Sequence, residues 1–150
     1  MPEDRDGLLQ HFRDMRAELL AAIEGLSDDQ VSDPSLDGWS VKDHLLHLAA
    51  WDELRAAEVA RISAGHASAW RLSGEQEDAY NALIYARRRD LSARQARWEL
   101  EASHRQLLDA IAAAAPRGLD ASHYGEAALR STHEAQHTVW IKRWRAERRI

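Results

Sequence analysis

The 150-residue sequence contains no cysteine, three prolines and no long uninterrupted run of apolar residues. Without cysteine the chain can form neither disulfides nor thiolate metal sites, and it has no cysteine nucleophile. A transmembrane helix needs about 20 consecutive apolar residues, so we expect no contact with a membrane. The N-terminal residues also lack the basic and apolar regions of a secretory signal, and we therefore expect a cytoplasmic location.

The charge pattern argues against a nucleic-acid partner. The net charge is −5, with 20 basic and 25 acidic residues. Phosphate backbones are bound by clustered Lys and Arg, and the one basic cluster, residues 142–149, is interrupted by Trp144 and Glu147. The length is that of one ordinary domain and 45% of the residues are hydrophobic, so we interpret residues 1–150 as a single globular domain.

Apolar residues recur at intervals of three and four along most of the chain, which predicts an all-α fold. The four main helices are expected at Asp6 to Glu24, Ser40 to Ser63, Ser92 to the residues before Pro116, and about Glu126 to the C-terminus. The second and third begin with a capping-box pattern, a serine followed three residues later by an acidic or amide residue. We expect a connection at 26–38, rich in Ser and Asp, and a further short helix at Glu75 to Arg89.

Two histidines on the expected last helix, His133 and His137, are four residues apart and therefore lie on one helix face. Leu129 and Ile141 lie on the same side, which directs both imidazoles into the bundle. Buried neutral imidazoles need partners for both nitrogens, so a bound ion is one interpretation and an ordinary hydrogen-bonded core pair is the other. If the second and last helices are neighbours, His47 can join the pair, and three imidazoles suit zinc, nickel, copper or iron(II).

The remaining aromatic and imidazole side chains receive simpler interpretations. Four tryptophans are expected to be core or loop-anchoring residues: Trp39, Trp51, Trp140 and Trp144. Four histidines are expected to be surface residues or to form local hydrogen bonds: His11, His66, His104 and His123.

Residues 133–137 also match the H-E-x-x-H motif of zinc peptidases, in which Glu134 would be the general base. Such enzymes need a third ligand downstream. Trp140 and Arg143 stand where the extended motif has Gly and His, and Glu147 is the one carboxylate after the motif. A zinc peptidase therefore stays a remote alternative.

Residues 38–43, Gly-Trp-Ser-Val-Lys-Asp, resemble the pattern that opens the second helix in proteins of the DinB superfamily. In this resemblance the first metal-binding histidine of the family corresponds to His47 and not to the nearby His44. The H-x-x-x-H pair of the family's last helix corresponds to His133 and His137.

The resemblance implies a DinB/YfiT-like antiparallel four-helix bundle with a long connection that contains an extra short helix. Residues 81–85 and 102–108 are similar to the ClbS/DfsB-like branch of the superfamily. The implied ligands of one divalent metal ion, zinc, nickel or iron, are His47, His133 and His137.

The function implied by the resemblance is metal-dependent transfer of a low-molecular-weight thiol or water to an electrophilic small molecule, in detoxification or a stress response. A homodimer is also implied. Candidates for handling protons are Glu134, Glu58 and Tyr85. The alternative is a metal-binding or ligand-sequestering bundle without turnover.

The three-histidine and peptidase interpretations predict different outcomes at His47 and Glu134. If three histidines bind the metal, His47→Ala should weaken binding by more than the roughly 10 to 100-fold typical of residues beside a ligand. Glu134→Gln should then keep its metal. In a peptidase, Glu134→Gln would abolish peptide cleavage and His47 would be dispensable. Metal content and peptide cleavage of both untagged variants test this, and full metal content in His47→Ala contradicts the three-histidine site.

Overall fold

The computed structural model describes residues 2–70, 73–125 and 129–150, and these residues form helices, turns and loops without a strand. The helices are α1 (Arg5–Ile23), α2 (Asp28–Ser32), α3 (Val41–Ser63), α4 (Gly74–Arg88), α5 (Ala93–Ala112) and α6 (His133–Arg148), with short 3₁₀ helices η1 (Pro116–Leu119) and η2 (Ala121–His123). The predicted all-α class is confirmed. None of the described helices is long and apolar enough to span a membrane.

Local sequence explains where most helices begin. The Ser40 hydroxyl accepts a hydrogen bond from the N–H of Asp43, and the Asp43 carboxylate accepts one from the N–H of Ser40, which completes the predicted capping box of α3. At α5 the hydroxyl of Ser92 accepts a bond from the N–H of Gln95. Gly25 follows α1 with φ of 80°, a left-handed conformation that glycine adopts without strain.

The structure adds one short helix that was not predicted and moves one predicted helix boundary. The connection 26–38 contains the short helix α2, which begins with a capping box between Ser27 and Gln30. The last helix begins at His133 and not near Glu126 as predicted. Residues 129–132 are not helical, and Glu126 itself lies outside the described residues. The imidazole of His11 lies 2.6 Å from the carbonyl oxygen of Ser131 and occupies an acceptor that a longer α6 would use internally.

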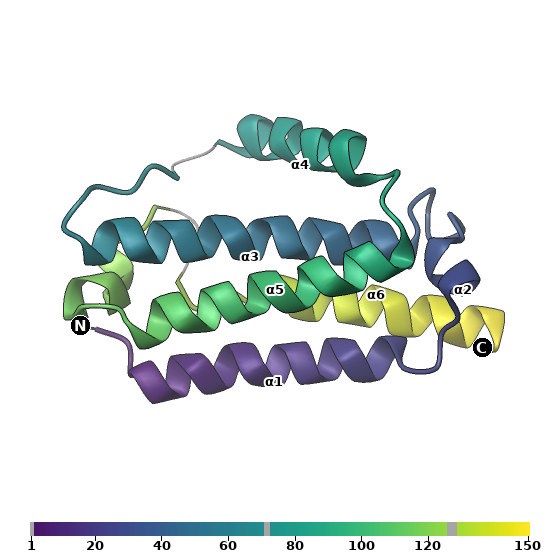
Figure 1. Cartoon of the computed structure of the whole chain (residues 1–150), viewed down its shortest axis with the longest axis horizontal. Coiled ribbons are helices and arrows are strands. Elements are labelled where there is room, and N and C mark those ends of the chain that lie inside the picture. Colours follow the sequence, from purple (N-terminus) through teal and green to yellow (C-terminus); the bar gives the residue numbers. More distant parts are fainter. Residues whose placement is uncertain (1, 71–72, 126–128) are drawn as a thin grey trace.

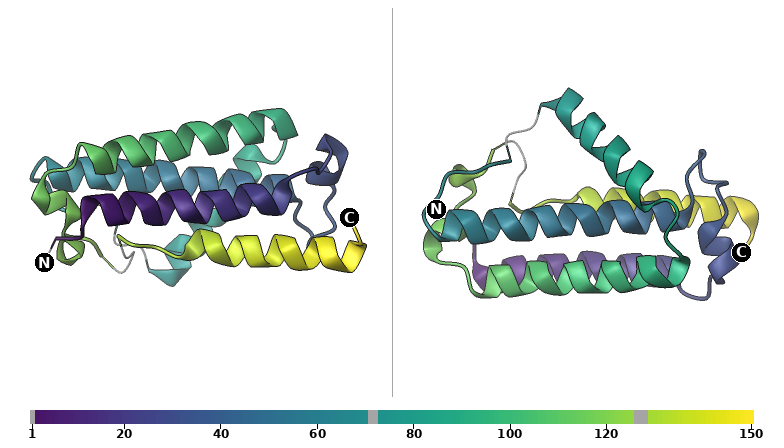
Figure 2. Two further views of the ribbon diagram at one scale, coloured as in Figure 1. Left: turned by 90° about the horizontal axis from the view of Figure 1, so that it is seen from below. Right: turned by 45° about the horizontal axis from the view of Figure 1, so that its top comes forward.

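The four long helices α1, α3, α5 and α6 form the bundle (Figure 1). The helices α1 and α6 pack side by side and run in one direction, while α3 and α5 pack side by side and run in the other. The connection through α4 makes this possible, because it returns the chain to the end of the bundle where α3 begins. The helix α4 lies outside the bundle and packs against α3 (Figure 2).

A buried arginine joins all four bundle helices. Arg16 on α1 donates to the carbonyl oxygen of Leu100 on α5 at 2.8 Å and to the Asp52 carboxylate on α3 at 2.6 Å. It also donates two hydrogen bonds, of 3.2 and 2.8 Å, to the Glu134 carboxylate on α6. Burial alone would lower the pKa of Arg16, but Glu134 and Asp52 raise it overall, so the guanidinium remains charged.

We expect Arg16→Met to destabilise the protein by about 3–5 kcal/mol, because it leaves the buried Glu134 carboxylate without its cation and removes one of the two arginines that act on Asp52. The control is Arg105→Met, which removes an exposed ion pair with Glu101 and should change stability by less than about 1 kcal/mol. Chemical denaturation of both variants measures the difference. Equal stabilities would contradict a joining role for Arg16.

Candidate metal centre

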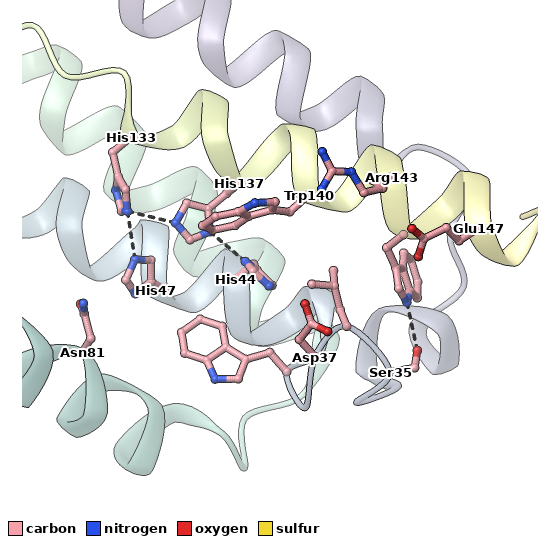
Figure 3. A pocket seen from close by; sticks show the side chains of 13 residues that line it. Ser35, Asp37, His44, His47, Asn81, His133, His137, Trp140, Arg143 and Glu147 are labelled. Atoms are coloured by element: carbon pink, nitrogen blue, oxygen red, sulfur yellow. Dashed lines mark hydrogen bonds between the residues drawn. The ribbon is translucent and has the colours of Figure 1, made fainter.

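The three histidines expected to bind a metal come together between α3 and α6 (Figure 3). The Nε2 atom of His133 lies 3.3 Å from Nε2 of His47 and 3.0 Å from Nε2 of His137. One nitrogen from each ring lies within 4.8 Å of the other two. The spacing of four on α6 places His133 and His137 one turn apart, and α3 supplies His47 from the opposite side.

This arrangement fits a tetrahedral metal ion. Zn–N bonds of about 2.0–2.1 Å at tetrahedral angles separate neighbouring ligand nitrogens by about 3.3 Å, close to the observed 3.3 and 3.0 Å. Without a metal, a single proton or lone pair on Nε2 of His133 must serve two neighbouring nitrogens. The Nδ1 atom of His47 is buried and makes no hydrogen bond within the described residues. One cation would satisfy all three Nε2 atoms at once.

The surroundings keep these imidazoles neutral, which is the form that binds metals. Burial, together with the charges of His133 and His44, lowers the pKa of His47 to about 3. Burial lowers the pKa of His137 to about 2, with His133, His47 and His44 contributing. The pKa of His133 is lowered by burial and by Arg55. Protons therefore compete weakly for the ligand nitrogens near neutral pH.

A fourth imidazole belongs to the same cluster. The Nδ1 atoms of His44 and His137 lie 2.8 Å apart, within hydrogen-bond distance. Burial lowers the pKa of His44 to about 4, and Nε2 of His44 is buried without a hydrogen-bond partner in the described part of the chain. His44 stands three residues before His47 and therefore shares its helix face, and this spacing is the sequence signal that could have identified it.

The cluster forms one wall of a cavity of about 630 Å³ (Figure 3). Its lining includes aromatic, polar and charged side chains: Ser35, Leu36, Asp37, Trp39, His44, His47, Asn81, His133, His137, Trp140, Arg143, Trp144 and Glu147. The charged residues Asp37, Arg143 and Glu147 lie at the end away from His133 (Figure 3). The three-histidine cluster thus borders a space large enough for a small molecule.

Aromatic side chains enclose the cluster. Trp39 contacts the rings of His44 and His47 edge-on, with centroids 5.1 and 5.7 Å away. Trp140 lies 4.9 Å from His137 and is 37% exposed, so it lines the cavity and is not the core residue that the sequence suggested. Asn81 also lines the cavity and was not predicted as a site residue. Its Oδ1 accepts a hydrogen bond from Nε1 of Trp51 at 2.8 Å.

Glu134 points away from the cavity despite its position between the two histidines of α6. Its carboxylate is buried and paired with Arg16, and it is absent from the cavity lining given above. A peptidase general base must reach the metal-bound reactant, and this carboxylate is instead part of the ion-pair network of the bundle. The H-E-x-x-H match therefore has no support in the geometry.

The other two candidates for proton handling also lie outside the cavity lining. Glu58 is buried at the far end of α3, about 16 Å along the helix from His47, where it accepts hydrogen bonds from Ser68 and Arg61. The ring of Tyr85 stacks on Trp39 at 5.6 Å. Glu58 therefore anchors the loop after α3, and Tyr85 supports one wall of the cavity from behind.

Fold and site together define a helical bundle with a three-histidine centre at the edge of a small-molecule cavity. A family model described as the DinB superfamily matches residues 11–141. The chain therefore belongs to the DinB superfamily. No curated protein and no solved structure matched the chain in the corresponding comparisons.

The imidazole cluster predicts that the metal-free protein loses stability in mild acid. The pKa values of His44, His47, His133 and His137 are lowered in the fold. From about pH 6.5 to about pH 4 the unfolded chain therefore binds more protons, and stability falls as pH falls by about 1.4 kcal/mol per pH unit for each proton. Asp52 opposes this, because burial raises its pKa to about 6, but it is one group against the four of the cluster and His104, whose pKa burial lowers to about 4.

Denaturation of chelator-treated protein between about pH 7.5 and about pH 4.5 measures this slope. The variant His137→Leu removes the imidazole with the pKa of about 2 and should flatten the profile. The control His66→Leu changes an exposed imidazole and should leave the profile unchanged. Identical slopes in all three proteins would contradict burial of neutral imidazoles in this cluster.

Proposed function

We propose that this protein is a divalent-metal-dependent enzyme that transfers a low-molecular-weight thiol or water to an electrophilic small molecule. The observation that carries the proposal is the convergence of one ring nitrogen each from His47, His133 and His137 on the wall of a cavity of about 630 Å³. A metal with three protein ligands retains open coordination positions, as catalytic rather than closed structural sites do.

A divalent ion held here would supply Lewis acidity, which generates a nucleophile from a thiol or water at neutral pH. The chain's own residues supply the enclosure. Trp39 and Trp140 shield the imidazoles from bulk water at the cavity wall. Because Oδ1 of Asn81 is engaged by Trp51, the amide N–H groups of Asn81 are available to an acceptor atom of a molecule in the cavity.

The proposal also covers the identity of the metal, the branch of the DinB superfamily and the location of the protein in the cell. Imidazole ligands suit zinc, nickel or iron(II). The similarity of residues 81–85 and 102–108 to the ClbS/DfsB-like branch favours detoxification of an electrophile. We further propose that the protein works as a homodimer in the cytoplasm.

A second candidate function is sequestration of a reactive small molecule without turnover. The feature that favours it is the exclusion from the cavity lining of Glu134, Glu58 and Tyr85, the three residues considered for proton handling. In this function the bundle would bind the metal and the ligand and would release no product. Turnover separates the two functions.

We expect zinc-, nickel- or iron-loaded protein to convert a thiol-reactive electrophile over many cycles when a small thiol is present. Chelation should abolish turnover, and His133→Ala should reduce it by more than about 100-fold, because a metal ligand is lost. His123→Ala, outside the cavity lining, is the control and should remain active. Product formation that stops at one equivalent would support sequestration, and activity unaffected by chelator would contradict a metal-dependent enzyme.

A further inference from the structure

The fourth histidine of the cluster has a role that can be argued from its hydrogen bond. We infer that His44 is a positioning residue, which accepts a hydrogen bond from Nδ1 of His137 and so keeps Nε2 of His137 free of a proton for a metal ion. This inference rests on the proposed metal centre and adds a residue to it. His44 would act through His137 and not as a ligand itself.

The geometry indicates which nitrogen of His137 faces the metal site and which nitrogen faces His44. Nε2 of His137 lies 3.0 Å from Nε2 of His133 and faces the point where the three rings converge. The opposite nitrogen, Nδ1, lies 2.8 Å from Nδ1 of His44. A neutral imidazole carries one proton, so a His137 that binds metal through Nε2 must carry its proton on Nδ1. That proton then has His44 as its acceptor.

The same reasoning assigns the proton on His44. If Nδ1 of His44 accepts the bond from His137, the proton of a neutral His44 must be on Nε2. Nε2 is the atom that is buried without a partner in the described residues, on the side of the ring away from His137 (Figure 3). The reverse direction, with Nδ1 of His44 as donor, would place the proton of His137 on Nε2 and block metal binding.

Packing holds His44 in position for this bond. Its ring is 4% exposed and meets Trp39 at 5.1 Å and Trp140 at 6.1 Å, both edge-on. Two tryptophans, one before α3 and one on α6, therefore limit rotation of the imidazole. Ligating histidines commonly donate their other N–H to a carboxylate, carbonyl or water, and here a second imidazole takes that place.

The two nitrogens of His44 are positioned differently from those of the proposed ligands. The nitrogens that lie within 4.8 Å of one another belong to His47, His133 and His137, and His44 is outside this group. His44 approaches the group through the far side of His137. It is therefore placed to orient a ligand and not to replace one.

Zinc affinity of three variants tests this role, with a chromophoric chelator as competitor. His44→Leu introduces an apolar side chain of similar size that has no acceptor, and should weaken zinc binding by about 10 to 100-fold. His44→Gln supplies an amide oxygen that can accept the bond and should recover much of that loss. The control His104→Leu removes a partly buried imidazole on α5, outside the cavity lining, and should bind zinc as the parent protein does.

Two outcomes of this titration would overturn the inference. Parent-like affinity in His44→Leu would show that His137 needs no partner at Nδ1. Equal losses of more than about 100-fold in His44→Leu and His44→Gln, with altered absorption of the cobalt(II) form, would show that His44 is itself a ligand.

Nitrogen NMR of the zinc-loaded parent protein tests the inference without a substitution. We expect a proton on Nδ1 of His137, a proton on Nε2 of His44 and no proton on Nδ1 of His44. A proton on Nδ1 of His44 would overturn the inference. If the parent protein binds no zinc, nickel or iron, the proposed function fails as well, whereas zinc binding without turnover contradicts the enzyme alone.

Discussion

The arrangement of the bundle depends on the hydrogen bonds and ion pairs of the buried Arg16 guanidinium. It binds α3 through Asp52, α5 through the carbonyl oxygen of Leu100 and α6 through Glu134. A buried charge is costly unless it is fully paired, so the bonding atoms of these helices have little freedom to move. Glu134 in particular must face α1. At about 100° per residue, His133 and His137 then lie roughly 60–100° away around α6, on the side of α3.

The site lies between two bundle helices that pack loosely against each other. The helix α6 packs mainly on α1 and α3 mainly on α5, so the backbones of α3 and α6 approach each other less closely. Imidazole and indole rings span this gap, with Trp51 and Trp39 beside the histidines. Long rings can cross a wider separation than aliphatic side chains, and they leave the cavity of about 630 Å³ at one end. A tightly packed seam would leave no room for a ligand.

One five-residue motif illustrates why position in space decides function. Residues 133–137 match the peptidase pattern, and two histidines at this spacing do converge. The glutamate between them is oriented by Arg16, 118 residues away in sequence, and serves the fold. His44 illustrates the opposite case, because its spacing of three from His47 indicates a shared helix face but no role. Its 2.8 Å contact with His137, 93 residues away, is what gives it a role.

The sequence by itself determined the all-α class, the helices at 41–63 and 93–112, and the pairing of His133 with His137, because periodicity and capping depend on residues a few positions apart. The resemblance also selected His47 over His44. Tertiary structure alone decided that α6 begins at His133, that Glu134 faces Arg16, and that Asn81 and His44 reach the cavity. Those outcomes depend on contacts between distant segments, whose free energies no local pattern contains.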